Sequence, residues 1–364
     1  MFRLPAGTYF QTYQQAHRFW PTRFMTLRMI GLLAVLFVAV PLVANNYVLS
    51  IANRIGYTIL AAMGVQLLIG FTGQLTLGHA AFVAVGAYAS AIFTLTAVEN
   101  ADIPFWGFLS QAGLAYPLSV VAACLLSGLW SVLFGLPSAR VKGFGIILTT
   151  MAAQFITVNF IIAQYVSQIG GRGHYFSLPA GTVKIGPWAL AGDRDAYFWM
   201  LILVVLVTAA MNNWKRTRPG RAWLAIRDND IAAEVLGVNI VRYKLLAYFA
   251  AGILAGLAGS FWITSLFFVS PEHFEWGSNS LWWVGVILIG GVGAVDGTIF
   301  GAIFLELMLV LVNSFSAANL DFLYFKDIAF GLAIILFLLY EPNGLAYRWW
   351  QIKNYFYLWP FSYK

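Results

Sequence analysis

Residues 52–96 read ANRIGYTILAAMGVQLLIGFTGQLTLGHAAFVAVGAYASAIFTLT. Within this stretch, two apolar segments, 52–71 and 78–96, flank a short break that contains glycine and polar residues. Each segment is long enough to cross a bilayer, because the hydrocarbon core is about 30 Å thick and a helix rises about 1.5 Å per residue. The stretch therefore predicts two membrane-spanning helices with an interruption between them.

The composition of the whole chain matches that of this stretch. Of its 364 residues, 61% are hydrophobic and 10% are charged, whereas soluble domains carry about 25% charged residues. The 21 basic and 14 acidic side chains are too few to cover the surface of a soluble protein. This excludes a secreted enzyme and a disordered chain, and the single Cys124 excludes an internal disulfide. We predict an all-α, polytopic integral membrane protein.

Hydrophobic segments define the predicted membrane domain, residues 29–340. We identify nine or ten segments as membrane-spanning or half-spanning helices: 29–49, 52–71, 78–96, 112–136, 144–164, 196–213, 246–268, 281–293, 298–313 and 325–340. The short segments 281–293 and 298–313 fit one broken helix, two half-helices or two spans. A basic segment, 1–28, precedes this domain, and an aromatic and basic tail, 341–364, follows it.

The basic residues predict how the chain is oriented in the membrane. If the N-terminus is cytoplasmic and ten segments alternate, the inner segments hold 16 of the 21 basic residues. The outer loops then hold eight acidic residues and five basic ones, Arg54, Arg172, Lys184, Arg194 and Lys326. Because cytoplasmic loops are enriched in Lys and Arg, both termini are predicted to be cytoplasmic. The net charge of +7 then indicates orientation and not a nucleic-acid partner.

The first candidate site is the break between the two opening segments. Irregular backbone is tolerated in a membrane only where protein packs around it or where it lines a cavity, and broken helices often build a substrate path. We therefore expect a translocation path or gate at Thr72, Gly73, Gln74, Thr76, Gly78 and His79. The alternative is a tight turn between two spans, with His79 as a polar residue that packs at a helix start.

A second break resembles the first at an offset of 220 residues. Leu68, Ile69, Gly70 and Gly73 match the residues at 288, 289, 290 and 293. Two interrupted segments in corresponding halves point to a binding site, so we add Gly290, Gly291 and Gly293 to the predicted path. Glycine-rich matches also arise without common ancestry. Two Gly-x-x-x-Gly pairs are predicted to pack helices closely: Gly252 with Gly256, and Gly297 with Gly301.

Two carboxylates lie in or near the apolar segments. An acid inside the membrane is a candidate functional residue, which makes Asp296 and Glu306 candidates for a proton or cation pathway. Asp296 lies at a predicted turn, where it can also be solvated or cap a helix. An ion-coupled carrier usually needs several such acids, and this chain has few.

The inner loop, 214–245, carries seven basic and three acidic residues and is longer than the other inner loops. Asp228 or Asn229 can cap a short helix that ends before Gly237. On this helix Ile231, Val235 and Leu236 share an apolar face. A solvated linker needs no such face, so the loop is predicted to dock a partner. The outer loop, 165–195, is rich in Gly and Pro and is predicted to be a cap or a docking surface.

Several catalytic and metal-binding patterns are missing from the sequence. It contains no Gly-x-x-x-x-Gly-Lys-[Ser/Thr] motif, so no P-loop for ATP is expected. The four histidines are scattered through different segments and form no metal-ligand pattern. No catalytic residues, metal or cofactor are therefore predicted for this chain.

The long motifs resemble LivM-type permeases, the membrane subunits of branched-chain amino-acid ABC importers. The resemblance rests on LLIGFTGQLTLGHAAFVAVGAY at 67–88, GRAWLAIRDNDIAAEVLGVN at 220–239, PEHFEW at 271–276 and ILIGGVG at 287–293. It covers about residues 50–340 in the expected order. It implies an ABC importer permease fold in a bacterial inner membrane.

The resemblance also implies partners and site residues. These are a LivH-type second permease, two ATP-binding cassette subunits that bind the ATP, and a periplasmic substrate-binding protein. The residues implied to face the ATPase are Arg221, Arg227, Asp228, Asn229, Glu234 and Gly237. The implied solutes are branched-chain amino acids, with urea, short amides and other amino or organic acids as alternatives within the same architecture. An ion-coupled secondary carrier is the alternative of a different class.

Overall fold

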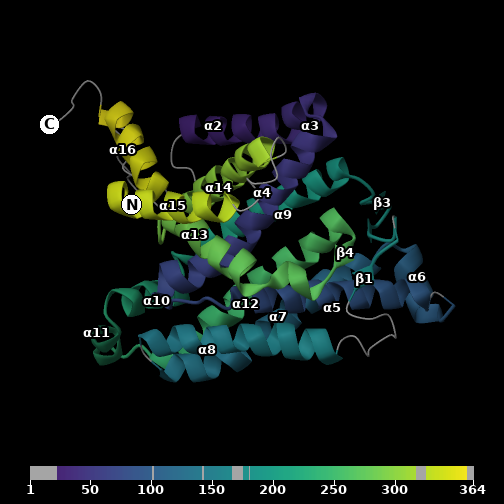
Figure 1. The fold of residues 1–364 in the computed structure, drawn as a ribbon, viewed down its shortest axis with the longest axis horizontal. Coiled ribbons are helices and arrows are strands. Elements are labelled where there is room, and N and C mark those ends of the chain that lie inside the picture. Colours follow the sequence, from purple (N-terminus) through teal and green to yellow (C-terminus); the bar gives the residue numbers. More distant parts are fainter. Residues whose placement is uncertain are drawn as a thin grey trace.

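The computed structural model describes residues 23–100, 102–141, 143–165, 175–179, 181–316 and 325–358. The basic N-terminal segment up to residue 22, part of the predicted outer loop and the last six residues lie outside this range. So do His17 and His174. Figure 1 shows a bundle in which long helices run side by side, with α2 along one flank and α8 along the opposite flank.

Eight helices among the described residues are long and apolar enough to cross a membrane. They confirm the predicted all-α, polytopic fold. Three of them continue through a π-helical stretch: α2 (Arg23–Ala34) into α3 (Val40–Val43), α4 (Asn46–Val65) to Phe71, and α8 (Phe144–Gln154) to Tyr165. The others are α5 (His79–Glu99), α7 (Ala115–Arg140), α9 (Asp193–Trp214), α12 (Ile240–Leu266) and α14 (Val295–Ser316).

One predicted boundary and the placement of Arg54 are corrected. The first turn lies at Ala44 and Asn45 and not near residue 50, because both residues are extended and α4 begins at Asn46. Arg54, counted above as an outer-loop charge, therefore lies inside α4.

Residues 281–313 form one short helix followed by one long helix. Helix α13 (Leu281–Gly290) has 10 residues and is about 15 Å long, so it cannot cross a membrane alone. Helix α14 is long enough. Helices α15 (Phe325–Tyr340) and α16 (Gly344–Leu358) form a pair that is bent by 46° and together can supply a ninth span.

Close helix packing holds the centre of the bundle together. A Cβ atom added at Gly256 of α12 would lie 2.7 Å from the Cα atom of Cys124 in α7. Gly252 packs against α7 in the same way, and Gly301 of α14 packs against the carbonyl of Val286 in α13. Both Gly-x-x-x-Gly pairs thus bring helices into close contact, which is the role predicted for them.

Short elements cover the two ends of the bundle. At one end, β1 (Phe176–Ser177) pairs with β4 (Phe268–Val269), and β2 (Lys184–Ile185) pairs with β3 (Trp188–Ala189), beside α6 (Pro104–Gln111). At the other end lie α10 (Arg218–Asp228) and α11 (Asp230–Val235). The two-residue strands and α6 were not predicted, because such short elements leave no periodic pattern in the sequence.

Candidate functional site

The first break separates α4 from α5 and turns the chain back into the bundle. The backbone is irregular from Gly73 to Gly78, and Gly73 has a φ of 70° that favours glycine. A Cβ atom added at Gly64 would collide with the ring of His79. His79 begins α5, so the start of α5 lies beside Gly64. Gly64 precedes Gly70 by six residues, which places the start of α5 about 9 Å from Gly70, back along α4. Helix α5 thus begins inside the bundle.

Helix α8 holds this break and a second irregular segment in one place. The hydroxyl of Thr150 accepts a hydrogen bond from the backbone N–H of Leu77 at 3.2 Å. One turn further along, the side-chain amide of Gln154 donates to the carbonyl of Phe274 at 2.6 Å. The N–H of Ala80 donates to the hydroxyl of Ser280 at 3.0 Å. The starts of α5 and α13 therefore meet in the interior.

We call this meeting point the core junction and define it as His79, Thr150, Gln154 and Ser280. The ring of His79 makes edge contacts with Phe82 and Trp283. Both nitrogens of His79 lack a hydrogen-bond partner among the described residues.

The polar residues predicted to line a path are enclosed by this chain. Thr72, Gln74, Thr76 and His79 are between 0% and 3% exposed. Among the described residues, the polar side-chain atoms of Gln74 and Thr76 also have no hydrogen-bond partner. Buried unpaired polar groups are uncommon and each costs about 1–3 kcal/mol. Gln74, Thr76 and His79 are therefore buried polar side chains whose hydrogen-bonding capacity is unused among the described residues in this conformation.

The second break separates α13 from α14 by only four residues. Gly291 and Gly293 have φ values of 121° and 86°, which a side chain would strain. Gly290 packs directly against Gly297 across the turn. The chain therefore reverses direction at once, and α13 and α14 lie against each other.

The two breaks meet at a second cluster, the hinge junction, which comprises Gln66, Gly70, Lys215, Arg227 and Gly293. A Cβ atom added at Gly70 would lie 2.8 Å from the backbone nitrogen of Gly293. The ammonium of Lys215 donates to the carbonyl of Gly293 at 2.9 Å. The guanidinium of Arg227 donates to the carbonyl of Gly70 at 2.6 Å. One cation from the 214–245 loop thus holds each break.

Gln66 and Lys215 were not predicted as site residues. The amide of Gln66 donates to the carbonyls of Gly291 and Ala294 at 3.2 and 2.8 Å, so it ties α4 to the second break. A polar residue in the apolar run 52–71 was the available signal. Lys215 directly follows the last residue of α9, and only the tertiary structure shows that it turns toward Gly293.

The pKa of Lys215 is lowered to about 8, mainly by burial. The charge of Asp296 opposes the shift, and the charge of Arg227 adds to it. The ammonium also lies 4.8 Å from the centre of the Phe71 ring, where a cation is attracted to the ring face. Asp296 itself lies in the first turn of α14. This position is consistent with the alternative that Asp296 stabilises a helix start. Its charge also acts on Lys215.

The 214–245 loop forms two capped helices, where one was predicted. The hydroxyl of Thr217 accepts from Gly220 N–H at 3.3 Å and caps α10. The side chain of Asn229 accepts from Ala232 N–H at 3.0 Å and caps α11, which confirms the predicted capping residue. Gly237 follows α11 with a φ of 86°, as expected for a helix stop.

The apolar residues of these two helices face different surroundings. Trp223 and Ile226 of α10 are 2% and 4% exposed, and the indole of Trp223 donates to the carbonyl of Tyr243 at 2.9 Å. By contrast, Ile231, Val235 and Leu236 are 65%, 83% and 82% exposed. Helix α10 is therefore anchored to the bundle, whereas α11 presents an uncovered apolar tip.

The predicted ATPase-facing residues divide in the same way. Asp228, Asn229, Glu234 and Gly237 are exposed. Arg221 is also exposed, and its guanidinium donates to the carbonyl of Arg216 at 2.7 Å. Arg227 has an exposed part, but its guanidinium points inward to Gly70.

Glu306 is engaged in an ion pair between α4 and α14. Its carboxylate lies 2.9 Å from the guanidinium of Arg54 and accepts from the hydroxyl of Thr58 at 2.6 Å. Glu306 is 5% exposed. A carboxylate neutralised in this way has a structural role in joining two helices.

The chain was compared with known proteins. Residues 47–338 match the family model "Branched-chain amino acid transport system / permease component". The chain is 27% identical over 334 residues to the high-affinity branched-chain amino acid transport system permease protein LivM of Salmonella typhimurium, which covers 86% of this chain and 73% of that protein. Identity to LivM of Escherichia coli is 28% over the same shares.

More distant relatives include the fructose import permease protein FrcC of Rhizobium meliloti, at 27% identity over 66% of this chain and 70% of that protein. No solved structure matches the chain. The family model covers most of the chain and includes both breaks and the helices α10 and α11. The chain therefore belongs to the family of permease components of branched-chain amino acid transport systems.

Proposed function

We propose that this chain is a transmembrane subunit of an ATP-driven importer and forms part of the path for branched-chain amino acids. It has no catalytic residues of its own, and ATP is bound by partner subunits. The orientation predicted from the distribution of Lys and Arg would put the N-terminus, α10 and α11 on the cytoplasmic side of a bacterial inner membrane. The β-strands and α6 then lie on the periplasmic side.

One observation carries this proposal: a continuous connection runs from the exposed tip of α11 to both breaks. Ile231, Val235 and Leu236 offer an apolar surface to a partner. Helix α10 leads from this surface to Arg227 on Gly70, and Lys215 beside it holds Gly293. A force applied at α11 would therefore act on the backbone at two helix interruptions. Such interruptions are where transporters open and close a path.

The partners follow from this architecture. Two ATP-binding cassette subunits are the proposed cytoplasmic partners, and the α11 tip is the proposed contact of this chain with them. The tip is apolar, and the charged residues Arg221, Asp228 and Glu234 of α10 and α11 are exposed. A periplasmic binding protein fits the opposite end, where β1 and β4 join two outer segments. We propose a LivH-type second permease as the other half of the path. The polar residues of the core junction are buried within this chain, so the described part of this chain alone has no open path through them.

The solute is proposed by analogy with the relatives of this chain. Two LivM proteins name branched-chain amino acids, whereas more distant relatives name fructose and ribose. Urea, short amides and other amino or organic acids remain alternatives for the same architecture. The ion-coupled alternative is less favoured, because Arg54 and Thr58 already engage the carboxylate of Glu306.

Reconstitution with the partner subunits in proteoliposomes tests the proposal. We expect uptake of radiolabelled leucine that requires ATP and the binding protein and that persists when a protonophore collapses the proton gradient. The variants Arg227→Glu and Glu234→Lys should lower uptake about tenfold or more while ATP hydrolysis continues, because the connection through α10 and α11 is cut.

Arg348→Gln, a change at an exposed side chain of α16, is the control and should transport normally. Uptake driven by a proton gradient without ATP would contradict the importer. Normal coupled uptake in both charge reversals would contradict the role given to α10 and α11. Uptake of urea or an amide in place of leucine would correct the solute alone.

A further inference from the structure

A groove of about 510 Å³ lies on the bundle at the end that carries α10. It is bordered by α7, the start of α10 and the first turns of α12. Its lining residues are Val132, Arg218, Pro219, Arg242, Tyr243, Leu245, Leu246 and Phe249. This volume falls within the roughly 300–1,000 Å³ of small-molecule sites.

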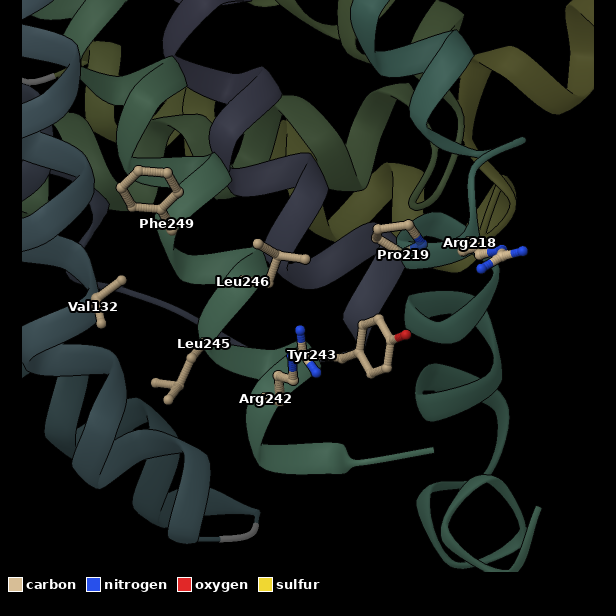
Figure 2. Close-up of a pocket in the computed structure, with 8 residues that line it drawn as sticks. All are labelled: Val132, Arg218, Pro219, Arg242, Tyr243, Leu245, Leu246 and Phe249. Carbon is tan, nitrogen blue, oxygen red and sulfur yellow. The ribbon is translucent and has the colours of Figure 1, made fainter. Parts of the chain in front are cut away.

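The groove is apolar at its deep end and basic at its rim. Phe249 lies nine residues into α12, and Val132 lies eight residues before the end of α7, so both are about 12–14 Å from those helix ends. Arg242 lies in the first turn of α12, and Arg218 begins α10. Figure 2 shows Arg242 between Leu245 and Tyr243, with Arg218 beyond Pro219 at the far edge.

The surface beside the groove is suited to lipid. The exposed large hydrophobic side chains of α7 are all aliphatic: Leu118, Val121, Leu125, Leu126, Leu129, Leu133 and Leu136. Hydrocarbon tails solvate such a face well. A guanidinium at the rim instead requires an anion or water at the membrane surface. None of the eight lining residues is acidic, so neither arginine is neutralised within the groove.

We propose that this groove binds one anionic phospholipid from the leaflet on the α10 side. An acyl chain lies along Leu245, Leu246 and Phe249, and the phosphate lies at Arg242 with Arg218 on its outer side. Guanidinium groups pair well with phosphate oxygens. Basic pockets between transmembrane helices on one side of the membrane are suited to acidic headgroups.

The proposal requires only that the groove lies at a membrane border, so it does not depend on which solute is transported. The orientation given under Proposed function would make the leaflet cytoplasmic. Because Arg218 begins α10, the lipid would also contact the start of the segment that leads to Arg227.

Native mass spectrometry of the purified permease complex tests the site. After detergent washing and titration with phosphatidylglycerol, we expect one tightly held lipid per copy of this chain. Phosphatidylcholine with the same acyl chains should be held less tightly. The double variant Arg218→Gln/Arg242→Gln should weaken phosphatidylglycerol binding about thirtyfold, about fivefold for each arginine near an acidic headgroup.

Two controls keep the result specific to the groove. Arg348→Gln/Lys353→Gln removes the same charge from α16 and should leave retention unchanged. Arg242→Lys keeps the charge and should retain much of the binding, which separates headgroup contact from misfolding. A millimolar excess of inorganic phosphate should not displace the lipid, because the acyl chain contributes to binding.

Equal retention of both lipids, or equal retention in Arg218→Gln/Arg242→Gln and the wild-type chain, would overturn the proposal. So would a cross-link from Leu246→Cys to another permease subunit, since that subunit would then fill the groove. Displacement of the lipid by inorganic phosphate would reduce the site to a simple anion site.

Discussion

The two glycine breaks share a sequence pattern but differ in structure. The first unwinds six residues, 73–78, and carries the start of α5 back into the bundle. The second reverses the chain within four residues, 291–294, so that α13 and α14 pack directly together. Polar side chains occupy the first break, whereas glycine and small apolar residues dominate the second. The pattern Leu-Ile-Gly followed by a second glycine therefore specifies an interruption and not its shape.

The two breaks also differ in what supports them. The first is held from inside by Thr150 and Ser280, with one outer contact, from Arg227 to Gly70. The second is held by the side chains of Gln66 and Lys215, which follow the ends of α4 and α9, and by backbone bonds from Gly291 to Ile287 and from Ala294 to Gly291. We infer that the second break responds more easily to movement of the 214–245 loop. The first break would then carry that movement to the core junction.

The largest expected effect comes from filling the first break. In Gly78→Ala, the new methyl group collides with the backbone carbonyl of Thr150, which has no free space into which it can move. We expect a loss of about 3 kcal/mol or more and little assembled protein, measured by detergent-solubilised yield and thermal unfolding. Gly293→Ala should cost less, because there the added atom meets the flexible end of Arg227. The φ of 86° at Gly293 still adds backbone strain of about 1–2 kcal/mol.

Gly331→Ala serves as the matched control for both. Gly331 lies in α15 and has no atom within 4 Å of the added position, so its yield should be normal. If Gly78→Ala proved as stable as Gly331→Ala, the close contact between the first break and α8 would be wrong. A larger loss for Gly293→Ala than for Gly78→Ala would reverse the comparison between the two breaks.

An intermediate effect is expected when the second break loses its support from α4. Gln66→Leu removes the hydrogen bonds to the carbonyls of Gly291 and Ala294 and leaves them, among the described residues, only their backbone partners, the N–H groups of Ala294 and Thr298. Each lost bond should cost about 0.5–1.5 kcal/mol. A cysteine at Val292, which is 38% exposed, should react several-fold faster with a maleimide in this variant. Cys124→Ala provides the background without other thiols.

A second reporter distinguishes local loosening from general unfolding. Leu75 lies in the first break and is 50% exposed. A cysteine there should react at the same rate with or without Gln66→Leu, because Gln66 bonds only the second break among the contacts described. Faster reaction at both positions would show that the breaks move as one unit, which would remove the distinction drawn here.

The smallest expected effect is a pH dependence of transport through Lys215. With a pKa of about 8, the ammonium is about nine-tenths protonated at pH 7 and about one-tenth at pH 9. Deprotonation weakens the bond to Gly293, so coupled uptake should fall over this range. Lys215→Arg stays charged and should keep its uptake between pH 7 and 9. Equal pH profiles for the two proteins would contradict the role of this charge.

The sign of the stability effect separates this loss from unfolding. The folded-state pKa of Lys215 lies below the ordinary value of 10.5, so the unfolded chain binds more protons between about pH 8 and pH 10.5. Stability contributed by this group therefore rises with pH in that window. A fall in uptake near pH 9 without a fall in melting temperature is the expected result. A parallel fall in both would assign the loss to unfolding.

Much of the architecture was predictable because it depends on local patterns. Apolar length predicted most spans, and Asn229 and Gly237 marked the ends of α11. Glycine spacing predicted close helix packing, which the structure shows between α12 and α7. The short β-strands, α6 and the separation of α10 from α11 were missed, because each depends on contacts and not on periodicity.

The candidate site was only half predictable. The sequence indicated where the helices break, and Arg227 was included among the predicted residues. That its guanidinium reaches Gly70, 157 positions away in the chain, is visible only in the structure. The same holds for the pairing of Arg54 and Thr58 with Glu306, which are 252 and 248 positions apart. Such distant contacts leave no mark in a single sequence.

By itself, the sequence determined that this is a polytopic helical membrane protein with two interrupted helices and a charged loop for a partner. Those features follow from apolar run length, glycine and polar residues within such runs, and the distribution of Lys and Arg. The tertiary structure alone decided that the two interruptions meet and that Lys215 and Arg227 hold them together. It did so because helix packing, and not local propensity, determines which distant backbone carbonyls lie within reach of a cation.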